Sequence, residues 1–498
     1  MAPEARTIKP DLRIILGALL LALSFPRAGL WWCAPIGAAA LFWAWQDASW
    51  KRSFALGWFA GWIFLSISFW WWSTTIVAEV GPLAYVAVLI AAAIEALAIG
   101  AAGALAALAR ARTLPALAPV ATAAAFAITE WLRSIGPVGV PFAQLGFTQA
   151  DSPLRIFAAY VGTNGVTFVL CAVAAYAADA LARRTWRSFA IAVTCVALAG
   201  IAAWIAWPAR TLPAPQIRVS AIQGNIAQSL KWNPSSLPLA IDRYTTMTMQ
   251  AAASHPALVV WPETVITING GGLNQSPAYV AQFTQLARSI DSEIVVGSID
   301  AHNNQLYNGL FLFTPQGLVG AYDKRQLVPF AEHFPGQAFL WWIPYVGQLN
   351  GNFAEGNGPI AFPTRSGLTI GPLICWESAF GDLAYDEVRS GAQLLVISTD
   401  DAWFGTSSGP YQHAQIAQLR AVEAGAYVVR AAATGISGII APDGTWQARA
   451  PLETQAVVNG YVGPPPGSVF ARIGPTRVWI AMLVLYALAV LLPWRRRG

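Results

Sequence analysis

The chain is poor in charged residues, cysteine and histidine. Only 11% of its 498 residues are charged, whereas 56% are hydrophobic; ordinary soluble domains carry about 25% charged residues. This composition excludes a disordered chain, a coiled coil and a nucleic-acid-binding arm, and it argues against a simple cytosolic enzyme. The 4 histidines show no metal-ligand spacing. No phosphate-binding glycine loop and no HExxH motif occurs, so no metal and no cofactor is expected.

The few charges are divided unevenly along the chain. Residues 210–476 carry 13 Lys and Arg against 17 Asp and Glu, a net charge of −4, although the whole chain carries +5. The positive charge therefore comes from short clusters beside apolar runs in residues 1–209 and 477–498, and a nucleic-acid partner loses its main support. With 23 Trp, 23 Phe and a mean hydropathy of +0.49, the composition indicates contact with lipid.

Long apolar runs predict a multi-pass α-helical membrane domain, since a spanning helix needs about 20 mostly apolar residues. Runs of this kind occupy residues 11–25, 29–46, 54–73, 83–109, 115–132, 154–182, 188–208 and 477–494. We expect the first to be a retained helix and not a cleaved signal peptide, because Pro26-Arg27-Ala28-Gly29 follows it without a small-x-small cleavage site. The predicted organisation is seven helices over 1–209, a globular domain over 210–476 and a final helix with a basic end over 477–498.

Basic residues predict the orientation of these helices. With the N-terminus in the cytoplasm, the cytoplasmic side would hold Arg6, Lys9, Arg13, Lys51, Arg52, Arg110, Arg112, Arg183, Arg184, Arg187, Arg495, Arg496 and Arg497. The short outer loops would hold only Arg27, Arg133 and Arg155. Because cytoplasmic loops are enriched in Lys and Arg, the globular domain is expected on the periplasmic side of the cytoplasmic (inner) membrane.

Cysteine usage singles out one residue. Cys33, Cys171 and Cys195 fall in predicted helices, whereas Cys375 is alone in the globular domain. An unpaired thiol in an oxidising compartment is a candidate reactive group, and an ordinary buried core cysteine is the alternative.

Four polar residues in or near the predicted helices need partners. Glu95 and Asp179 are carboxylates inside apolar runs, where they are either functional or hydrogen-bonded between helices. Glu130 and Arg133 lie three residues apart near a helix end, so a local ion pair is expected between them.

From Pro213 onward the pattern alternates between strands and helices. Strands are predicted at 217–223, 257–263, 293–299, 308–315, 318–324, 367–376, 392–400, 434–442 and 455–462. Helices are predicted at about 237–253, 277–290, 381–390 and 411–425. This alternation predicts one α/β domain with covered sheets.

Three motifs place reactive groups at the ends of predicted strands, where α/β sheets expose their sites. They are Trp261-Pro262-Glu263, Tyr322-Asp323-Lys324-Arg325 (followed by Pro329-Phe330-Ala331-Glu332) and Ile374-Cys375-Trp376-Glu377. A carboxylate can accept a thiol proton, an ammonium can stabilise an oxyanion, and a thiolate is a nucleophile. The spacing alone fixes no geometry. Glu263 could be a helix-start carboxylate, Lys324 a surface charge and Cys375 a core thiol.

A Cys–His pair is a further option, with His333 or His413 as the base.

These motifs, with Ser398–Gly405 (STDDAWFG), resemble the nitrilase (carbon-nitrogen hydrolase) superfamily. With the helices, the final span and QGNIAQSLKW at 223–232, the whole chain resembles the apolipoprotein N-acyltransferase family. The resemblance implies an α-β-β-α sandwich and acyl transfer through a cysteine thioester, the final step of lipoprotein maturation. The implied donor is a phospholipid, preferably phosphatidylethanolamine, and the implied acceptor is the α-amine of a diacylglyceryl-cysteine apolipoprotein. The oligomeric state is left open, with a monomer as one option.

The resemblance also implies residue roles. Glu263 corresponds to the general base, Lys324 to the oxyanion-stabilising lysine, Cys375 to the nucleophile and Glu332 to a second carboxylate that supports the lysine. Positions around the substrate entrance correspond to Trp232, Trp376, Glu377, Trp403 and Phe404. Two residues depart from the family pattern: Asp400 stands where Asn is expected, and Trp376 where Tyr is common.

Two other functional classes fit parts of this pattern. A membrane-anchored nitrilase-type amidase would use the same three residues and let water resolve the thioester, but eight helices exceed the needs of an anchor. A non-catalytic receptor or a transporter leaves the reactive groups at the strand ends unexplained, and the chain shows no inverted repeat.

Overall fold

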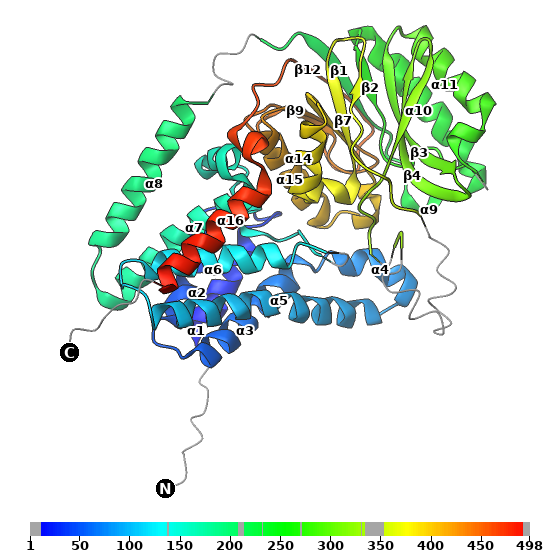
Figure 1. Ribbon diagram of the computed structural model, residues 1–498. Helices are drawn as coiled ribbons and strands as arrows, with labels where there is room; N and C mark the ends of the chain where they lie inside the picture. Colours follow the sequence, from blue (N-terminus) through cyan, green and yellow to red (C-terminus); the bar gives the residue numbers. More distant parts are fainter. Residues whose placement is uncertain are drawn as a thin grey trace.

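The computed structural model describes residues 11–136, 139–207, 214–231, 233–268, 271–329, 331–333 and 353–491. Within these residues an N-terminal helical part lies beneath a two-sheet α/β part, and the last helix, α16, runs back along the helical part (Figure 1).

The helical part contains a helix for each apolar run before residue 209. Its helices are α1 (Leu12–Leu23), α2 (Cys33–Trp45), α3 (Trp50–Ser68), α4 (Trp72–Val80), α5 (Leu83–Arg110), α6 (Ala118–Leu132), α7 (Ala158–Arg183) and α8 (Arg187–Ile205). Among the described residues, four helical segments are long and apolar enough to cross a membrane: α5, α7 with the turn before it, α8 and α16. The apolar helices α1, α2 and α6 are shorter. The expected third run, 54–73, is α3 together with the start of the separate helix α4.

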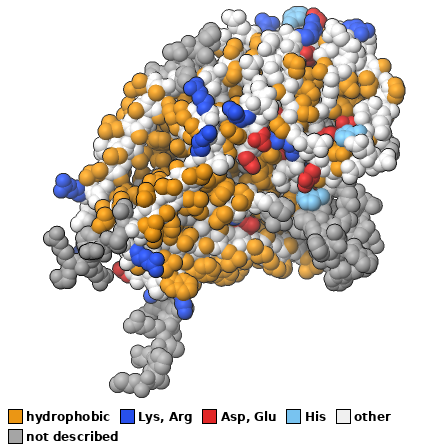
Figure 2. Space-filling view, in the orientation of Figure 1, with side chains coloured by type: hydrophobic (Ala, Val, Ile, Leu, Met, Phe, Trp, Pro, Cys, Tyr) orange, Lys and Arg blue, Asp and Glu red, His pale blue; other side chains and the backbone are white. Residues whose placement is uncertain are grey.

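Helix α8 gives a physical reason to place this part in lipid. None of its residues is buried, and Leu198 and Ile201 are 62% and 55% exposed. Figure 1 shows α8 standing apart along one side of the molecule, and Figure 2 shows hydrophobic side chains over much of the helical half. Such a surface is unfavourable in water and is satisfied by acyl chains.

The last helix, α16 (Val469–Leu491), begins earlier than the expected residue 477 and is broken at Gly474, which has φ +77°. A side chain at Gly474 would place its Cβ 2.7 Å from the ring of Tyr385. The break lets the first turns pack on the α/β part while the remainder packs on α6 and α7. The chain end is therefore fixed to both parts.

Buried polar groups in the helical part correct one expectation. Glu130 does not pair with Arg133; it accepts hydrogen bonds from the Leu145 backbone N–H (2.8 Å) and the Thr167 hydroxyl (2.7 Å). Arg133 lies 3.8 Å from Glu95 instead. Helix α6 ends at Leu132, so the chain is already turning at Arg133, and its side chain reaches a different helix. Sequence proximity had suggested the local pair.

The α/β part consists of two stacked six-stranded sheets. One has the order β12-β1-β2-β3-β4-β5 and the other β11-β10-β9-β8-β7-β6. The strands are β1 (Ile217–Gln223), β2 (Leu258–Val260), β3 (Glu293–His302), β4 (Gln305–Thr314), β5 (Gly317–Asp323), β6 (Phe362–Pro363), β7 (Thr369–Ile374), β8 (Leu394–Thr399), β9 (Tyr427–Ala432), β10 (Gly438–Ile440), β11 (Trp446–Arg449) and β12 (Ala456–Val462). Apolar side chains of both sheets, among them Val260, Leu310, Val396 and Val429, form a shared core.

Helices cover the outer face of each sheet. Helices α10 (Leu237–Ala251) and α11 (Pro277–Ser289) cover the first sheet, and α14 (Gly381–Arg389) and α15 (Gly409–Ala424) cover the second; the short α9 is Gln228–Lys231. The expected α-β-β-α sandwich is thus confirmed. Strands β6, β9 and β11 were not expected: β6 has two residues, β9 carries the charge of Arg430 in its interior, and β11 alternates polar residues at the domain surface.

Helices α14 and α15, which cover the second sheet, lie against the N-terminal helical part (Figure 1). Glu423 of α15 accepts hydrogen bonds from the backbone N–H (2.6 Å) and hydroxyl (2.7 Å) of Thr163 in α7. Arg420 pairs with Glu423 at 2.7 Å and donates to the Thr163 hydroxyl at 3.0 Å. The N–H of Thr163 is free for this contact because α7 breaks at Gly162. A buried polar contact therefore fixes the α/β part against α7.

Candidate active site

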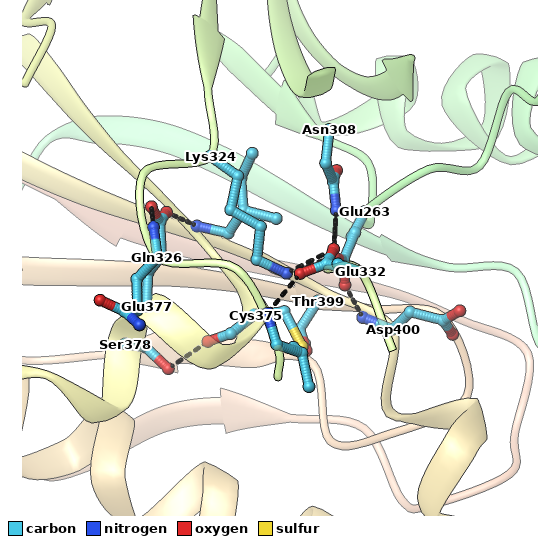
Figure 3. Close-up of polar contacts among 12 residues, drawn as sticks. Glu263, Asn308, Lys324, Gln326, Glu332, Cys375, Glu377, Ser378, Thr399 and Asp400 are labelled. Atoms are coloured by element: carbon cyan, nitrogen blue, oxygen red, sulfur yellow. Dashed lines mark hydrogen bonds and ion pairs between the residues drawn. The ribbon is translucent and has the colours of Figure 1, made fainter. Parts of the chain in front are cut away.

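The three candidate residues lie at the ends of three strands and meet between the two sheets. Glu263 follows β2, Lys324 follows β5 and Cys375 follows β7. Their exposed fractions are 5%, 0% and 7%. Figure 3 shows the carboxylate, the ammonium and the thiol grouped together with Glu332 and Asn308. Residues separated by more than fifty positions in the chain thus form one cluster.

Lys324 is held between two carboxylates. Its Nζ lies 3.1 Å from Glu263 Oε1 and 2.9 Å from Glu332 Oε1. The side-chain amide of Asn308 donates to the same two oxygens, at 2.7 Å each. The other oxygen of Glu263 accepts the backbone N–H of Asp400 at 2.8 Å. The positions of base and ammonium are therefore set by several hydrogen bonds.

The pKa values follow from burial and from these contacts. Burial opposes the charge of Glu263, but Lys324 and then Lys231 outweigh it and lower the pKa of Glu263 below its usual value. Burial also opposes the charge of Lys324, yet Glu263 and Glu332 raise its pKa. Burial and then Glu263 raise the pKa of the Cys375 thiol well above normal, although Lys324 opposes this. At neutral pH the site holds a carboxylate, an ammonium and a neutral thiol.

The backbone at Cys375 is held in an uncommon conformation, with φ +50°. Its carbonyl oxygen accepts the Ser378 hydroxyl at 2.8 Å and lies 3.0 Å from His413 Nε2. His413 Nδ1 is 2.9 Å from Asp401, which also accepts from Arg430 at 2.6 Å. Burial would raise the pKa of Asp401, but Arg430 and His413 lower it to about 2. This buried ion network holds the carbonyl behind the nucleophile.

The Cys–His alternative finds no support at His413 in this geometry, and a pair with His333 stays a prediction. Both ring nitrogens of His413 are occupied, one by Asp401 and the other by the Cys375 carbonyl and Ser378. His413 therefore contacts the backbone of Cys375, and Glu263 is the carboxylate beside the thiol.

Glu377 lies two residues after the nucleophile and is fully buried. It accepts backbone N–H groups of Ile374 (2.7 Å) and Arg325 (2.6 Å), and the hydroxyl of Tyr322 (2.9 Å). Burial raises its pKa. These contacts tie the Cys375 turn to the end of β5, where Lys324 lies. A role for Glu377 in binding substrate stays a prediction.

The expected entrance residues lie in different settings. Trp376 stacks on Phe142 of the helical part, with ring centroids 5.1 Å apart, and Phe404 packs on Trp71 at 4.6 Å. Trp403 is 41% exposed. Trp232 lies outside the described residues. Two of the five thus contact the helical part directly.

A cavity of about 760 Å³ lies beside this aromatic layer. Phe404 and Trp71 line it, whereas Glu263, Lys324 and Cys375 do not. Aromatic contacts lead from Trp71 through Phe142 to Trp376, the residue after Cys375. The cavity therefore adjoins the candidate active site without containing it.

Comparisons with known proteins agree with both parts of the structure. The model of the carbon-nitrogen hydrolase family matches residues 218–462, and that of the apolipoprotein N-acyltransferase N-terminal domain matches residues 17–176. Apolipoprotein N-acyltransferase of Geobacter metallireducens is 32% identical over 98% of this chain and 96% of its own. That of Methylococcus capsulatus is 32% identical over 93% and 92%. That of Photobacterium profundum is 28% identical over 97% and 96%.

The chain belongs to the apolipoprotein N-acyltransferase family. Membership confirms the expected acyltransferase class and the link to the nitrilase superfamily. Within this family, the departure at Asp400 has a local explanation. Lys231 Nζ lies 2.5 Å from Asp400 Oδ2 and donates to the Glu263 backbone carbonyl at 3.0 Å. Burial raises the pKa of Asp400, and Lys231 opposes that rise, so the additional carboxyl has its own cationic partner.

Sequence reasoning missed two residues that contact the cluster, Asn308 and Lys231, and gave a third, His413, only as a possible base for Cys375. Asn308 is a polar residue on the inward face of an apolar strand, and that position was its one signal. Lys231 stands beside Trp232 in a segment already noted, but nothing local links it to Glu263. His413 lies in a helix whose residues are almost all buried, which a weakly periodic sequence does not indicate.

One group of described residues has the geometry to hold a metal ion. The potential ligand atoms of Asp300, His302 and Asp323 lie within 4.8 Å of one another. His302 Nε2 is already 2.9 Å from Asp323 Oδ2, and Asp300 accepts the Ala301 backbone N–H at 2.8 Å. These contacts account for the cluster without an ion.

Proposed function

We propose that this chain transfers an acyl chain from a phospholipid, with phosphatidylethanolamine as the donor, to the N-terminal cysteine α-amine of diacylglyceryl apolipoproteins. The acyl chain is carried as a thioester on Cys375. The observation that carries the proposal is the Glu263–Lys324–Cys375 cluster, in a family member whose helical part packs directly against the α/β part.

The first half-reaction forms the thioester. Cys375 Sγ attacks the ester carbonyl carbon while its proton passes to Glu263, and the carbonyl oxygen becomes an oxyanion stabilised by the Lys324 ammonium. The C–O bond then breaks, and Glu263 returns the proton to the departing lysophospholipid oxygen. Because the thiol is neutral at rest, the thiolate develops together with the attack.

The second half-reaction transfers the acyl chain to the lipoprotein. The acceptor amine attacks the thioester carbonyl, Glu263 accepts an amine proton, and the C–S bond breaks to leave the amide. The proton then passes from Glu263 to the sulfur, which restores the starting state. Glu332 and Asn308 hold Lys324 and Glu263 in place throughout.

The proposal includes the membrane arrangement. Seven membrane-spanning helices precede the α/β domain, α16 returns the chain to the cytoplasm, and the catalytic domain lies on the periplasmic side of the inner membrane. The basic clusters beside α5, α7 and α8 support this orientation. Asn303, in the exposed turn between β3 and β4, offers the test. An Asn303→Cys variant in a Cys375→Ala background should react with a membrane-impermeant thiol reagent once the outer barrier is permeabilised, and absence of labelling would contradict the orientation.

The decisive experiment is intact-protein mass spectrometry of the purified chain after incubation with phosphatidylethanolamine and no acceptor. We expect a hydroxylamine-labile acyl adduct and release of lysophospholipid, both absent in Cys375→Ala. Addition of a diacylglyceryl-cysteine peptide should then discharge the adduct onto the peptide amine. If folded protein forms no adduct but hydrolyses soluble amides, a nitrilase-type amidase replaces the proposal.

A further inference from the structure

The cavity beside Phe404 has a mainly apolar lining with a smaller polar part. Ile67, Trp70, Trp71 and Phe404 form apolar walls, while the remaining lining is polar and includes Arg27. The polar lining otherwise consists of a glycine and hydroxyl side chains: Ser66, Thr74, Gly405, Thr406, Ser407 and Ser408. A cavity with this division suits a molecule that is apolar at one end and polar at the other.

The polar side of the cavity is electropositive from two independent sources. Arg27 is exposed, its guanidinium lies 5.9 Å from the ring centroid of Tyr411, and no carboxylate of the described residues pairs with it. Ser408 is the N-cap residue of the 16-residue helix α15, so the positive end of that helix opens onto the same space. An arginine beside a helix N-terminus is a favourable environment for a phosphate group.

The cavity also has the right position for the donor. Ser66 and Ile67 lie at the end of α3 that faces the α/β part, whereas the basic residues of α3 lie at its other end. In the proposed orientation this is the outer leaflet, at the level of the lipid headgroups. Phe404, at the cavity wall, also packs against the His413 ring at 6.2 Å, and His413 lies 3.0 Å from the Cys375 carbonyl.

We infer that this cavity binds the donor phospholipid, with Arg27, the hydroxyls of Thr406 and Ser408, and the N-terminus of α15 holding its phosphate. The inference rests on the proposed function and adds the part of the donor that the chain recognises. The hydroxyl groups of Thr406 and Ser408 have no hydrogen-bond partner among the described residues and are free to donate to phosphate oxygens. The diacylglyceryl-cysteine acceptor carries no phosphate, so the site discriminates donor from acceptor.

The test compares two acyl donors in single-turnover thioester formation by the full-length chain. One is phosphatidylethanolamine in mixed micelles, and the other is p-nitrophenyl palmitate, an ester without phosphate. Arg27→Gln removes a charge-assisted contact to phosphate. We expect it to lower kcat/KM for phosphatidylethanolamine about tenfold relative to kcat/KM for p-nitrophenyl palmitate, chiefly through KM. Arg27→Lys should lose less, because it keeps the charge but not the bidentate geometry. Arg365→Gln, at an exposed pair with Asp291, is the matched control.

The outcomes separate this inference from the proposed function. If the wild-type chain forms no adduct with any phospholipid, the proposed function fails. If it does, but Arg27→Gln lowers both donors equally or neither, the phosphate site is refuted. It is also refuted if Arg27→Gln slows only the discharge of a preformed acyl-enzyme by the acceptor. A reduced donor ratio in Arg27→Gln with an unchanged ratio in Arg365→Gln supports it.

Discussion

Replacement of Lys324 by methionine tests the electrostatics of the site most directly. The side chains of Lys324, Glu263 and Glu332 are 1%, 6% and 13% exposed, so solvent screens their interactions little. Methionine keeps most of the volume but removes the ammonium that lies between the two carboxylates. Two buried carboxylates that both contacted the same ammonium do not both stay ionised without it, so one of them takes up a proton.

The cost of that proton uptake sets the expected magnitude. A glutamate with an ordinary pKa of 4.5 is protonated at pH 7 at a cost of about 3.4 kcal/mol, from 1.36 kcal/mol per pH unit, and at pH 5 at a cost of about 0.7 kcal/mol. The first value lies within the range of about 3–5 kcal/mol for a broken buried ion pair. The stability deficit of Lys324→Met should therefore shrink by about 2.7 kcal/mol from pH 7 to pH 5.

The sign of this effect is opposite to that in the wild-type chain. There the pKa of Glu263 is lowered, so its contribution to stability is present above pH 4.5 and is lost as the pH falls through the folded-state pKa. In the variant one carboxyl has a raised pKa, which favours folding at low pH.

Thermal unfolding in detergent, followed by tryptophan fluorescence, measures the change. At about 2–4 °C per kcal/mol, Tm should fall by roughly 10 °C at pH 7 and by roughly 2 °C at pH 5. Lys51→Met, at an exposed lysine, is the control and should change Tm little at either pH. A deficit that is equal at the two pH values, or larger at pH 5, would refute this account. The variant should also form no thioester.

Three further changes probe other parts of the structure. Asp401→Asn leaves Arg430 buried without a counter-charge. We expect a loss of about 3–5 kcal/mol in the free energy of unfolding at neutral pH, measured by thermal unfolding, and this loss shrinks as the pH falls toward 2. Thioester formation should also be slower in single-turnover assays. Burial and Asp323 raise the pKa of Asp300 from 3.8 to about 6. This group therefore stabilises the fold most below pH 3.8, and its contribution is lost as the pH rises to about 6. Asp300→Asn should remove the corresponding fall in Tm between these pH values from a Tm–pH profile. Glu423→Gln weakens the buried contact with α7 and should increase cleavage in limited proteolysis, and unchanged cleavage would show that apolar packing alone holds the two parts together.

Local patterns in the sequence predicted most of the individual elements. Strand β1 matches the predicted range 217–223, and helix α11 matches 277–290 to within one residue. Strongly apolar or amphipathic runs show their type because burial follows a period of 2 or 3.6 residues. Where that period is short or interrupted, prediction failed. Strand β9 was missed since it follows α15 after only two residues and carries Arg430, whose charge is compensated by a distant residue, Asp401.

Motifs also indicated the chemistry, because Glu263, Lys324 and Cys375 stand where strands end and the family pattern assigns them roles. Their assembly is a property of the tertiary structure. The two sheets bring β2, β5 and β7 together, and the sequence separation of these residues contains no information on their distance.

Composition and motif order by themselves determined that this chain combines apolar helices with a nitrilase-like domain, because hydropathy and strand-end residues are local properties. Only the tertiary structure decided how the charges are satisfied: Asn308 between two carboxylates, Lys231 beside Asp400, and Glu95 rather than Glu130 as the partner of Arg133. A buried charge takes the partner that the packing brings within a few ångströms, and packing depends on the whole chain.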